Sequence, residues 1–396
     1  MRSEARLLQL ALAVAVGSGC AKERSISHDV VERDSAGIRL VTNSRPQRTT
    51  VLDGPTFEIG SRSANPVIEF GGIGDVIVLG DGTIVVVDGL SQSVHFFSAT
   101  GKPISSMGRA GSGPGEFLGT ASASLYRADT IAVYDSRLGR ISLLRAPGVL
   151  TRTVQFHPGT GYHFVGVASD SILLFFGDQR PPRPDPGFYW DSSAVIAFTP
   201  GSSRVDTVAN LPSYHRVGGA GEYSRPYFLA PRASLAALHG GFCTSRGDRP
   251  WVDCFDIAGR RTLSFSWQAP TTQVTEITRT AWLQGYERNQ LRQAGVRVEE
   301  MRAFLRERFT VAAWPDSLPH SGQIQISDGG DIWVQRYQTA LGEDPTEWFV
   351  FDTSGRWITV VQLPARFSLR RIAEPLLLGT WRDEDDVESV RGYRLR

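Results

Sequence analysis

The sequence predicts an all-β fold, a six-bladed β-propeller whose ring is closed by a strand from the N-terminal part of the chain. Three observations lead to this prediction. Two stretches of sequence match each other 47 residues apart, and a strand followed by a glycine turn recurs along the chain. Short strand-like segments near the N-terminus provide the strand that the last blade lacks.

The matching stretches belong to a repeated unit. Residues 82–88 (GTIVVVD) are matched by residues 129–135 (DTIAVYD), and Gly101 and Gly148 each lie 13 residues after the last Asp of their stretch. A second apolar run lies between the Asp and the Gly in both units. A unit of about 45 residues with four strands has the size of a propeller blade.

A strand that ends in an apolar anchor and a tight turn recurs five times. The turn ends in glycine because its last residue needs a positive φ, which glycine adopts at little cost. The five glycines are Gly101, Gly148, Gly201, Gly259 and Gly355.

These repeats define five complete blades and a sixth that is one strand short. We expect the complete blades at residues 73–107, 122–156, 163–210, 234–267 and 322–363. Residues 367–396 offer three further strands, and either residues 38–42 or residues 56–59 would supply the fourth. Closing the ring in this way removes unpaired strand edges, which invite aggregation.

Four insertions interrupt the repeats, and all four should lie on one face of the ring. Residues 179–192 and 338–346 lengthen the connection between the second and third strands of a blade, whereas residues 212–232 and 270–319 lie between blades. In a propeller these two kinds of connection emerge on the same face. Loops on a rigid scaffold often carry binding residues, so we expect a ligand at this face.

The longest insertion, between blades four and five, is predicted to be helical over about residues 272–313. It contains two segments with helical character, at residues 275–292 and 298–308. The apolar residues of the second segment recur at helical spacing and are Val298, Met301, Phe304 and Leu305. The helix pair either packs onto the rim of the propeller or forms a lid or docking element over the central channel.

Residues 1–20 are typical of a lipoprotein signal peptide, with two arginines, an apolar run and small residues before Cys20. Acylation of Cys20 would tether the protein to a membrane. Such motifs usually have Leu three residues before the Cys, where this chain has Gly17, so simple secretion is the alternative. We expect residues 21–36 to be a flexible tether and residues 37–396 to be a single propeller domain. The expected location is the outer membrane or the periplasm-facing side of the envelope.

Cys243 and Cys254 flank a turn-rich stretch between two strand-like runs. Folding this stretch as a hairpin places the two residues opposite each other, within reach of a disulfide. An oxidising compartment favours that bond, and two buried free thiols are the alternative. A metal site is not expected, because two Cys without neighbouring His cannot complete a tetrahedral set of ligands.

Residues 108–117 (GRAGSGPGEF) form the most distinctive stretch of the chain. It lacks the Lys-Ser/Thr end of a phosphate-binding loop and follows a strand, so a nucleotide site is not expected. Together with residues 135–141 (DSRLGRI), it resembles the NHL repeat, and the mature chain resembles bacterial six-bladed, NHL-like propeller lipoproteins. The chain departs from that repeat at Leu138, where the repeat has Asn, and at residues 91–93 (SQS), which lack both Asn and Arg. The resemblance therefore does not carry over a ligand bound by that Asn–Arg pair.

Charged residues at blade strand ends and in the glycine-rich stretch are the candidate ligand-binding residues. An Asp at a strand end either caps the following turn through its side chain or makes a polar contact near the channel. The candidates are Asp88, Arg109, Glu116, Asp135 and Arg137.

The sequence favours a non-catalytic binding module of the cell envelope, with a protein, peptide or glycan ligand. The alternative is a metal-dependent propeller hydrolase or lyase with its site at the channel mouth. Gluconolactonase- and paraoxonase-type propellers hold calcium with Glu, Asn and Asp, but the few Asn of this chain are not at blade strand ends. We therefore assign no catalytic residue, metal or cofactor. The net charge of +1 gives no reason to expect nucleic acid as a partner.

Overall fold

The computed structural model describes residues 29–46, 48–60, 68–159, 161–169, 171–177, 187–202, 204–218, 226–294, 297–339 and 344–395. The predicted signal peptide with Cys20, and residues 21–28 of the predicted tether, lie outside the described residues. The prediction of a flexible tether is wrong for its second half, because Val30–Ser35 forms a strand that pairs with the next one.

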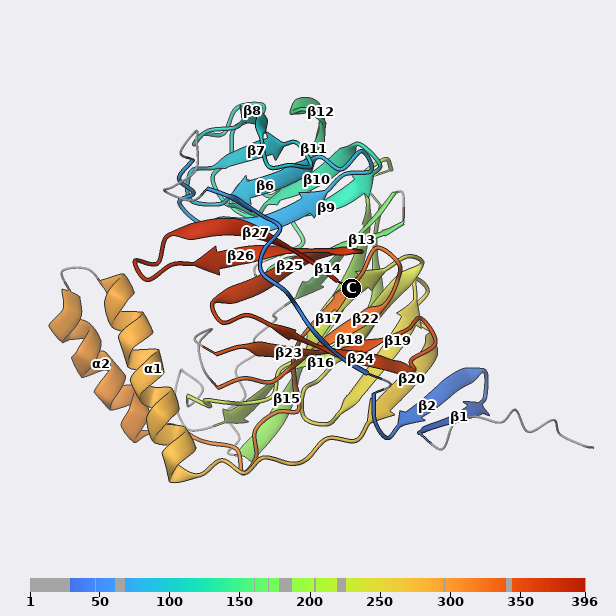
Figure 1. The fold of residues 1–396 in the computed structure, drawn as a ribbon, viewed down its shortest axis with the longest axis vertical. Helices are drawn as coiled ribbons and strands as arrows, with labels where there is room; N and C mark the ends of the chain where they lie inside the picture. Colours follow the sequence, from blue (N-terminus) through green and yellow to red (C-terminus); the bar gives the residue numbers. More distant parts are fainter. Residues whose placement is uncertain are drawn as a thin grey trace, which may run out of the picture.

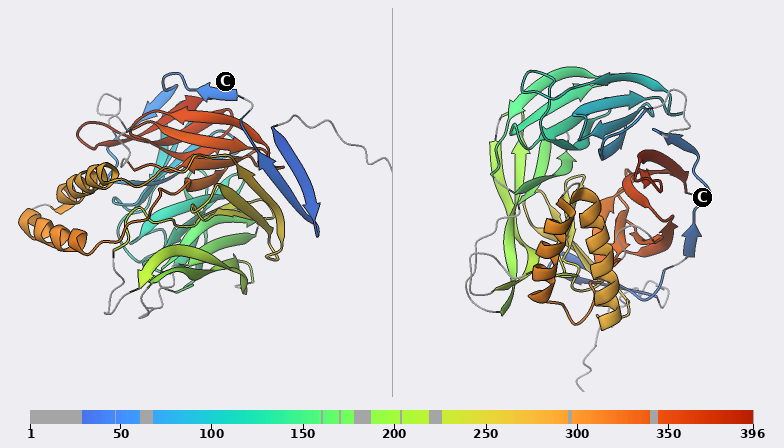
Figure 2. Two further views of the ribbon diagram at one scale, coloured as in Figure 1. Left: turned by 90° about the horizontal axis from the view of Figure 1, so that it is seen from below. Right: turned by 90° about the vertical axis from the view of Figure 1, so that its left-hand side faces the viewer.

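Six sheets, each built on four antiparallel strands, are arranged around a common axis, and two of them carry additional strands (Figures 1 and 2). This arrangement confirms the predicted six-bladed propeller. The first three blades follow the chain without interruption and consist of β5 (Ile73–Val78), β6 (Ile84–Asp88), β7 (Ser93–Phe97) and β8 (Pro103–Met107); β9 (Thr120–Arg127), β10 (Thr130–Asp135), β11 (Arg140–Arg145) and β12 (Val149–Gln155); and β13 (Tyr162–Ser169), β14 (Ile172–Gly177), β15 (Gly187–Thr199) and β16 (Arg204–Gly218).

The remaining blades are built in the same order, from the innermost strand outward. Blade six takes its fourth strand from the N-terminal part of the chain. The strands are β17 (Ser234–Leu238), β18 (Gly241–Ser245), β19 (Trp251–Asp256) and β20 (Arg261–Trp267); β21 (Ser321–Ile326), β22 (Ile332–Arg336), β23 (Thr346–Phe351) and β24 (Trp357–Leu363); and β25 (Phe367–Ala373), β26 (Leu376–Arg382), β27 (Glu388–Arg394) and β4 (Phe57–Ile59).

The segment that closes the ring also reinforces the two preceding blades. Strand β4 pairs antiparallel with β27, so of the two predicted segments residues 56–59 contain the one that closes blade six. The other, residues 38–42, belongs to β2 (Ile38–Asn43), which adds parallel to the outer edge of blade four. Strands β1 (Val30–Ser35) and β3 (Arg48–Val51) add to the edges of β2 and of blade five. We call β1–β4 the N-terminal strap.

Local sequence explains why the blades form. Strand β6 is buried over its whole length, because β-branched side chains fill both faces of a strand that lies inside its sheet. Neighbouring blades pack through large apolar side chains. For example, the rings of Phe265 in blade four and Phe351 in blade five lie 4.6 Å apart, centre to centre. Burial of each such side chain contributes roughly 1.5–3 kcal/mol to stability.

The predicted disulfide in blade four is confirmed. Cys243 of β18 and Cys254 of β19 are directly paired across the two strands, and their Cα atoms are 4.0 Å apart. Both residues are buried. The bond therefore joins the two middle strands of the blade at its core.

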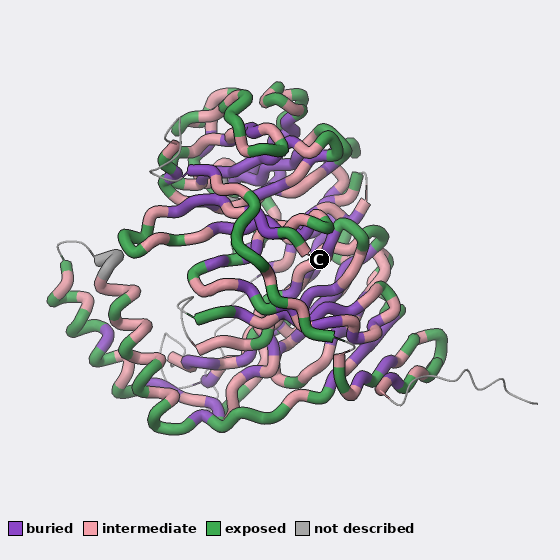
Figure 3. The backbone as a smooth tube through the Cα atoms, in the orientation of Figure 1, coloured by how far each residue is buried: buried purple, intermediate pink, exposed green. Residues whose placement is uncertain are grey.

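The predicted helical insertion is a pair of helices, α1 (Glu276–Ala294) and α2 (Val298–Thr310), between blades four and five. Figures 1 and 2 show the pair standing out from the ring, and Figure 3 shows that its surface is mostly exposed or half-buried. Of the residues predicted to form the apolar side of α2, Leu305 is buried but Phe304 is half exposed, because the helix packs mainly against α1. Neither helix has the length and apolar character needed to cross a membrane.

The helix pair is held at its base by an aromatic cluster. Phe228, in the connection between blades three and four, lies against Trp282 and Tyr286 of α1 and against Trp314 beyond α2, with ring centres 4.8–5.6 Å apart. Aromatic pairs at such distances add about 0.5–1.5 kcal/mol beyond their burial. Two of the predicted insertions, the one before blade four and the one before blade five, therefore pack against each other.

Candidate functional site

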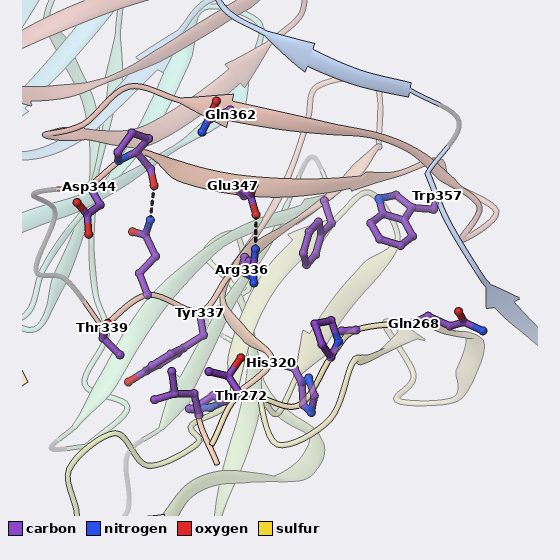
Figure 4. Close-up of a pocket in the computed structure, with 17 residues that line it drawn as sticks. Gln268, Thr272, His320, Arg336, Tyr337, Thr339, Asp344, Glu347, Trp357 and Gln362 are labelled. Carbon is purple, nitrogen blue, oxygen red and sulfur yellow. Dashed lines mark hydrogen bonds and ion pairs between the residues drawn. The ribbon is translucent and has the colours of Figure 1, made fainter. Parts of the chain in front are cut away.

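A cavity of about 550 Å³ lies between blades four and five on the face that carries the insertions (Figure 4). The outgoing arm of the helical insertion (Gln268–Thr272) and its returning arm (Leu318–His320) form one wall. The other wall is formed by the described residues on the two sides of the connection between the second and third strands of blade five, which are residues 336–339, Asp344, Pro345 and Glu347. Two of the four insertions predicted from the sequence thus meet at this cavity, which has the volume of a small-molecule binding site.

Hydrogen bonds within the blade-five loop hold this second wall in place. Arg336 at the end of β22 forms an ion pair with Glu347 of β23, with N and O 2.7 Å apart. The side-chain amide of Gln338 donates to the carbonyl oxygen of Pro345 at 2.6 Å. Because both contacts cross the loop, they fix its width without help from a ligand.

Two groups at the inner end of the cavity remain uncharged at neutral pH. Burial raises the pKa of Tyr337 to about 12, although the charge of Arg232 opposes the shift, so the phenol keeps its proton and can donate it in a hydrogen bond. Burial also lowers the pKa of His320, and the nearby Asp248 carboxylate only partly offsets this effect. The imidazole of His320 is therefore mainly neutral and can both donate and accept.

Asn43 of the strap lies next to the cavity and holds one of its lining residues, Trp357. Its side chain is fully buried and donates to the carbonyl oxygens of Ser266, at 3.0 Å, and Gly355, at 2.9 Å. Its side-chain oxygen accepts the backbone N–H of Trp357, a cavity-lining residue, at 2.9 Å. One side chain of the strap thus ties blade four to blade five beside the cavity. Sequence reasoning did not find this role, because nothing near Asn43 in the sequence indicates a partner more than 300 residues away.

A second group of side chains lies beside the cavity and joins it through His320. His215, on the extended hairpin of blade three, stacks on Trp190 with ring centres 5.0 Å apart. Arg246 lies 4.6 Å above the same Trp190 ring and forms an ion pair with Asp248. Burial lowers the pKa of His215, as it does for His320, and the Asp248 carboxylate opposes the shift in both. We call His215, Asp248 and His320 the imidazole cluster.

The predicted candidates Asp88 and Asp135 hold the turns at the ends of their own strands. The Asp88 carboxylate accepts four backbone N–H groups at 2.8–3.1 Å, two from the turn after β6 and two, from Gly71 and Gly72, in the segment that leads into β5. Burial opposes ionisation of Asp88, but these hydrogen bonds outweigh it and lower its pKa. Asp135 makes the same kind of contacts, to the backbone N–H groups of Leu118, Arg137 and Leu138.

The candidates in the glycine-rich stretch pair with each other. Arg109 forms an ion pair with Glu116 at 2.7 Å, and the Glu116 carboxylate also accepts the backbone N–H of Gly113 at 2.8 Å. Arg140 of β11 braces the loop from inside by donating to the carbonyl oxygens of Ser112, Gly113 and Glu116. The fifth candidate, Arg137, lies beside this loop, because a Cβ on Gly119 would touch its side chain.

The five candidates thus lie over blades one and two, and none is among the described residues that line the cavity between blades four and five. Their role in ligand binding stays a prediction. Among the described residues, no group of three His, Cys, Asp or Glu side chains is placed to hold a metal ion.

Comparisons with known proteins bear on the fold. The family model DUF5128, described as a 6-bladed beta-propeller, matches residues 66–143. No curated protein matches the chain.

Several solved structures are similar at low sequence identity. One is a protein from Bacteroides fragilis described as exported, with 10% identity, a TM-score of 0.48, and coverage of 90% of this chain and 99% of that chain. Another is a DUF4221-family member from Bacteroides vulgatus, with 8% identity, a TM-score of 0.48, and coverage of 93% and 99%. A third is the calcium-binding protein regucalcin from Agrobacterium tumefaciens, with 11% identity, a TM-score of 0.40, and coverage of 88% and 96%.

The six sheets establish the fold, and the family match over the first blades agrees with it. The chain is a six-bladed β-propeller whose last blade is closed by an N-terminal strand.

Proposed function

We propose that this propeller is a binding module of the cell envelope, which takes a ligand in the cavity between blades four and five. The observation that carries the proposal is that two of the four insertions which depart from the blade repeat form the walls of this cavity. The blade-five wall is held by its own hydrogen bonds, so a ligand would not have to order it and would bind at a lower entropic cost.

The proposal is tested with the labelled mature chain on arrays of peptides and of glycans. The cavity variant carries Gln338→Ala and Gln362→Ala, and the control variant carries Gln155→Ala and Lys102→Ala, which lie at exposed positions of blades two and one. We expect the cavity variant to lose at least 10-fold in affinity for the array hits and the control to keep it. Equal binding by both variants would refute the proposed site.

We also propose that the chain is exported and anchored through an acyl group on Cys20. The disulfide supports export, because such bonds persist in oxidising compartments. Cys20→Ser should move the protein from the membrane fraction to the soluble fraction. If the substituted protein stays with the membranes, the lipid anchor is wrong, and secretion or another attachment replaces it.

A second candidate function is a hydrolase or lyase that uses the imidazole cluster. The observation in its favour is that burial keeps the imidazoles of His215 and His320 mainly neutral near the charge of Asp248, and a neutral imidazole is suited to general base catalysis. The metal-dependent form of this alternative requires stoichiometric calcium or zinc in the purified protein. Metal analysis of the mature chain distinguishes it from the binding module.

A further inference from the structure

We infer that the ligand of the cavity between blades four and five is an uncharged oligosaccharide. This inference rests on the proposed function and adds the chemical class of the ligand. It follows from the charges, the hydrogen-bonding groups and the strand edges around the cavity.

The cavity offers little charge to a ligand. Its arginine, Arg336, is already paired with Glu347 at 2.7 Å, and His320 is mainly neutral because burial lowers its pKa. Among the described residues of the lining, the remaining charged one is Asp344. Phosphates, nucleotides and acidic peptides need cationic partners, which these described residues do not provide.

The polar groups of the cavity are of the kind that hydroxyl groups need. Gln268, Gln362 and Thr272 each carry both a donor and an acceptor. Each hydroxyl of a sugar donates one hydrogen bond and accepts others, so a mixed lining can satisfy several hydroxyls at once. The carboxylate of Asp344 can accept short, strong hydrogen bonds from hydroxyl groups.

Aromatic rings supply the apolar part of the lining. Tyr337, Phe349 and Trp357 line the cavity, and Figure 4 shows Tyr337 and Trp357 at different ends of it. Trp357 and Phe349 are only 6% and 8% exposed and pack against each other with ring centres 5.2 Å apart, so they offer the cavity narrow apolar edges, whereas Tyr337 is more exposed. A sugar ring has apolar C–H faces between its hydroxyls and therefore fits aromatic surfaces that alternate with amides.

The N-terminal strap removes the usual way of binding a peptide at this place. An extended peptide is commonly recognised by adding a strand to a free sheet edge, where its backbone forms a ladder of hydrogen bonds. On the blade-four side of the cavity the outer edge of β20 is already paired with β2, and on the blade-five side the outer edge of β24 is paired with β3. An extended peptide therefore finds no free edge of β20 or β24 to pair with, which favours a ligand recognised mainly through side chains, such as a sugar.

The experiment measures binding of the mature chain to neutral oligosaccharides of two to six units by titration calorimetry. The probes are β-1,4-linked glucose, xylose and N-acetylglucosamine oligomers and α-1,4-linked glucose oligomers. We expect at least one series to bind, with an affinity that stays within 2-fold between 50 and 500 mM salt, because no ion pair forms. Gln268→Ala and Asp344→Ala should each weaken binding at least 10-fold, whereas Gln155→Ala, an exposed glutamine of blade two, should not change it.

A displayed library of random heptapeptides is screened in parallel against the same proteins. If peptides bind and the cavity variants abolish that binding while no oligosaccharide binds, the sugar assignment falls and the proposed site remains. If oligosaccharides bind but the cavity variants bind them equally well, the proposed site falls as well. Binding by none of the oligosaccharides at millimolar concentration overturns the inference. Thermal unfolding of each variant shows whether a loss of binding reflects a loss of fold.

Discussion

The two halves of the ring are stabilised in different ways. Blades one to three end on their own fourth strand, and their turns are held by nearby residues such as Asp88 and Asp135. Blades four to six are each extended or completed by a strand of the N-terminal strap, through contacts between residues some 220 to 330 positions apart. The cavity lies in the strapped half, where two blades share one brace. In this molecule, pairing between neighbouring segments of the chain forms the ring, whereas pairing with the distant N-terminal strap joins the blades beside the cavity.

The strongest test of this comparison is Asn43→Ala. The change removes three buried hydrogen bonds and leaves two carbonyl oxygens and one N–H without their partner. We expect it to lower the free energy of unfolding by about 3–4 kcal/mol, measured by urea denaturation. Asn210→Ala, at an exposed position on the outer strand of blade three, is the matched control and should cost less than about 0.5 kcal/mol. Similar losses for the two variants would contradict the special role of the strap.

Removal of the disulfide tests whether blade four depends on local or on long-range contacts. The double variant Cys243→Ala and Cys254→Ala opens a loop closed over 11 positions. We expect a loss of about 2–3 kcal/mol in unfolding free energy, because the unfolded chain regains freedom. Reduction of the wild-type protein should give the same loss, and a larger loss in the variant than on reduction would indicate a packing defect.

Arg140→Ala examines the unstrapped half. Three carbonyl oxygens of the glycine-rich stretch lose their donor, so we expect a loss of about 2 kcal/mol in unfolding free energy. Arg145→Ala, an exposed arginine at the end of the same strand, is the control and should leave stability unchanged. Hydrogen exchange should locate the effect of Arg140→Ala in blades one and two. An effect that spreads to blades four and five would mean that the two halves are not independent.

Asp88→Asn should give the smallest effect, and one that depends on pH. The folded protein lowers the pKa of Asp88 below its ordinary value, so this group adds stability above about pH 4 that is lost as the pH falls through its folded pKa. The variant should lose about 1 kcal/mol at pH 7 and show a flatter decrease of stability between pH 5 and pH 3. A constant difference between the two proteins over this range would show that the charge of Asp88 is not what holds the turn.

The blades and their turns could be predicted because their information is local. Gly355 illustrates this, since its φ of 82° is the positive value that the turn signature requires, and Gly101, Gly148 and Gly259 also have positive φ. For Gly201 the prediction is wrong, because its φ is not positive. The closing strand was left open between two segments, because both have strand character and neither carries a local sign of its partner. The structure uses both, in different blades.

The cavity could be anticipated as a face but not as a set of residues. The insertions indicated the side of the ring. Gln268 and His320, however, lie at the same cavity only because the helical insertion leaves the ring after Gln268 and returns to it before His320. Two of the predicted ligand residues, Asp88 and Asp135, lie at strand ends, and a strand-end Asp looks the same in sequence whether it caps a turn or contacts a ligand. Phe304 was predicted to lie on the apolar side of its helix but is half exposed. Helical spacing of apolar residues does not reveal whether a partner surface is present.

The pairing of β4 with β27 has a consequence for how the protein is made. Residues 57–59 are synthesised more than 300 positions before their partners, residues 390–392. Chains are synthesised from the N-terminus, and domains fold as units once their parts are available. Strand β4 must therefore wait, unpaired and with exposed strand edges, until the last blade has been made, whereas β2 can pair with blade four and β3 with blade five as soon as those blades exist. The strand that closes the ring is thus made early and placed last, and during that interval the chain depends most on protection from aggregation.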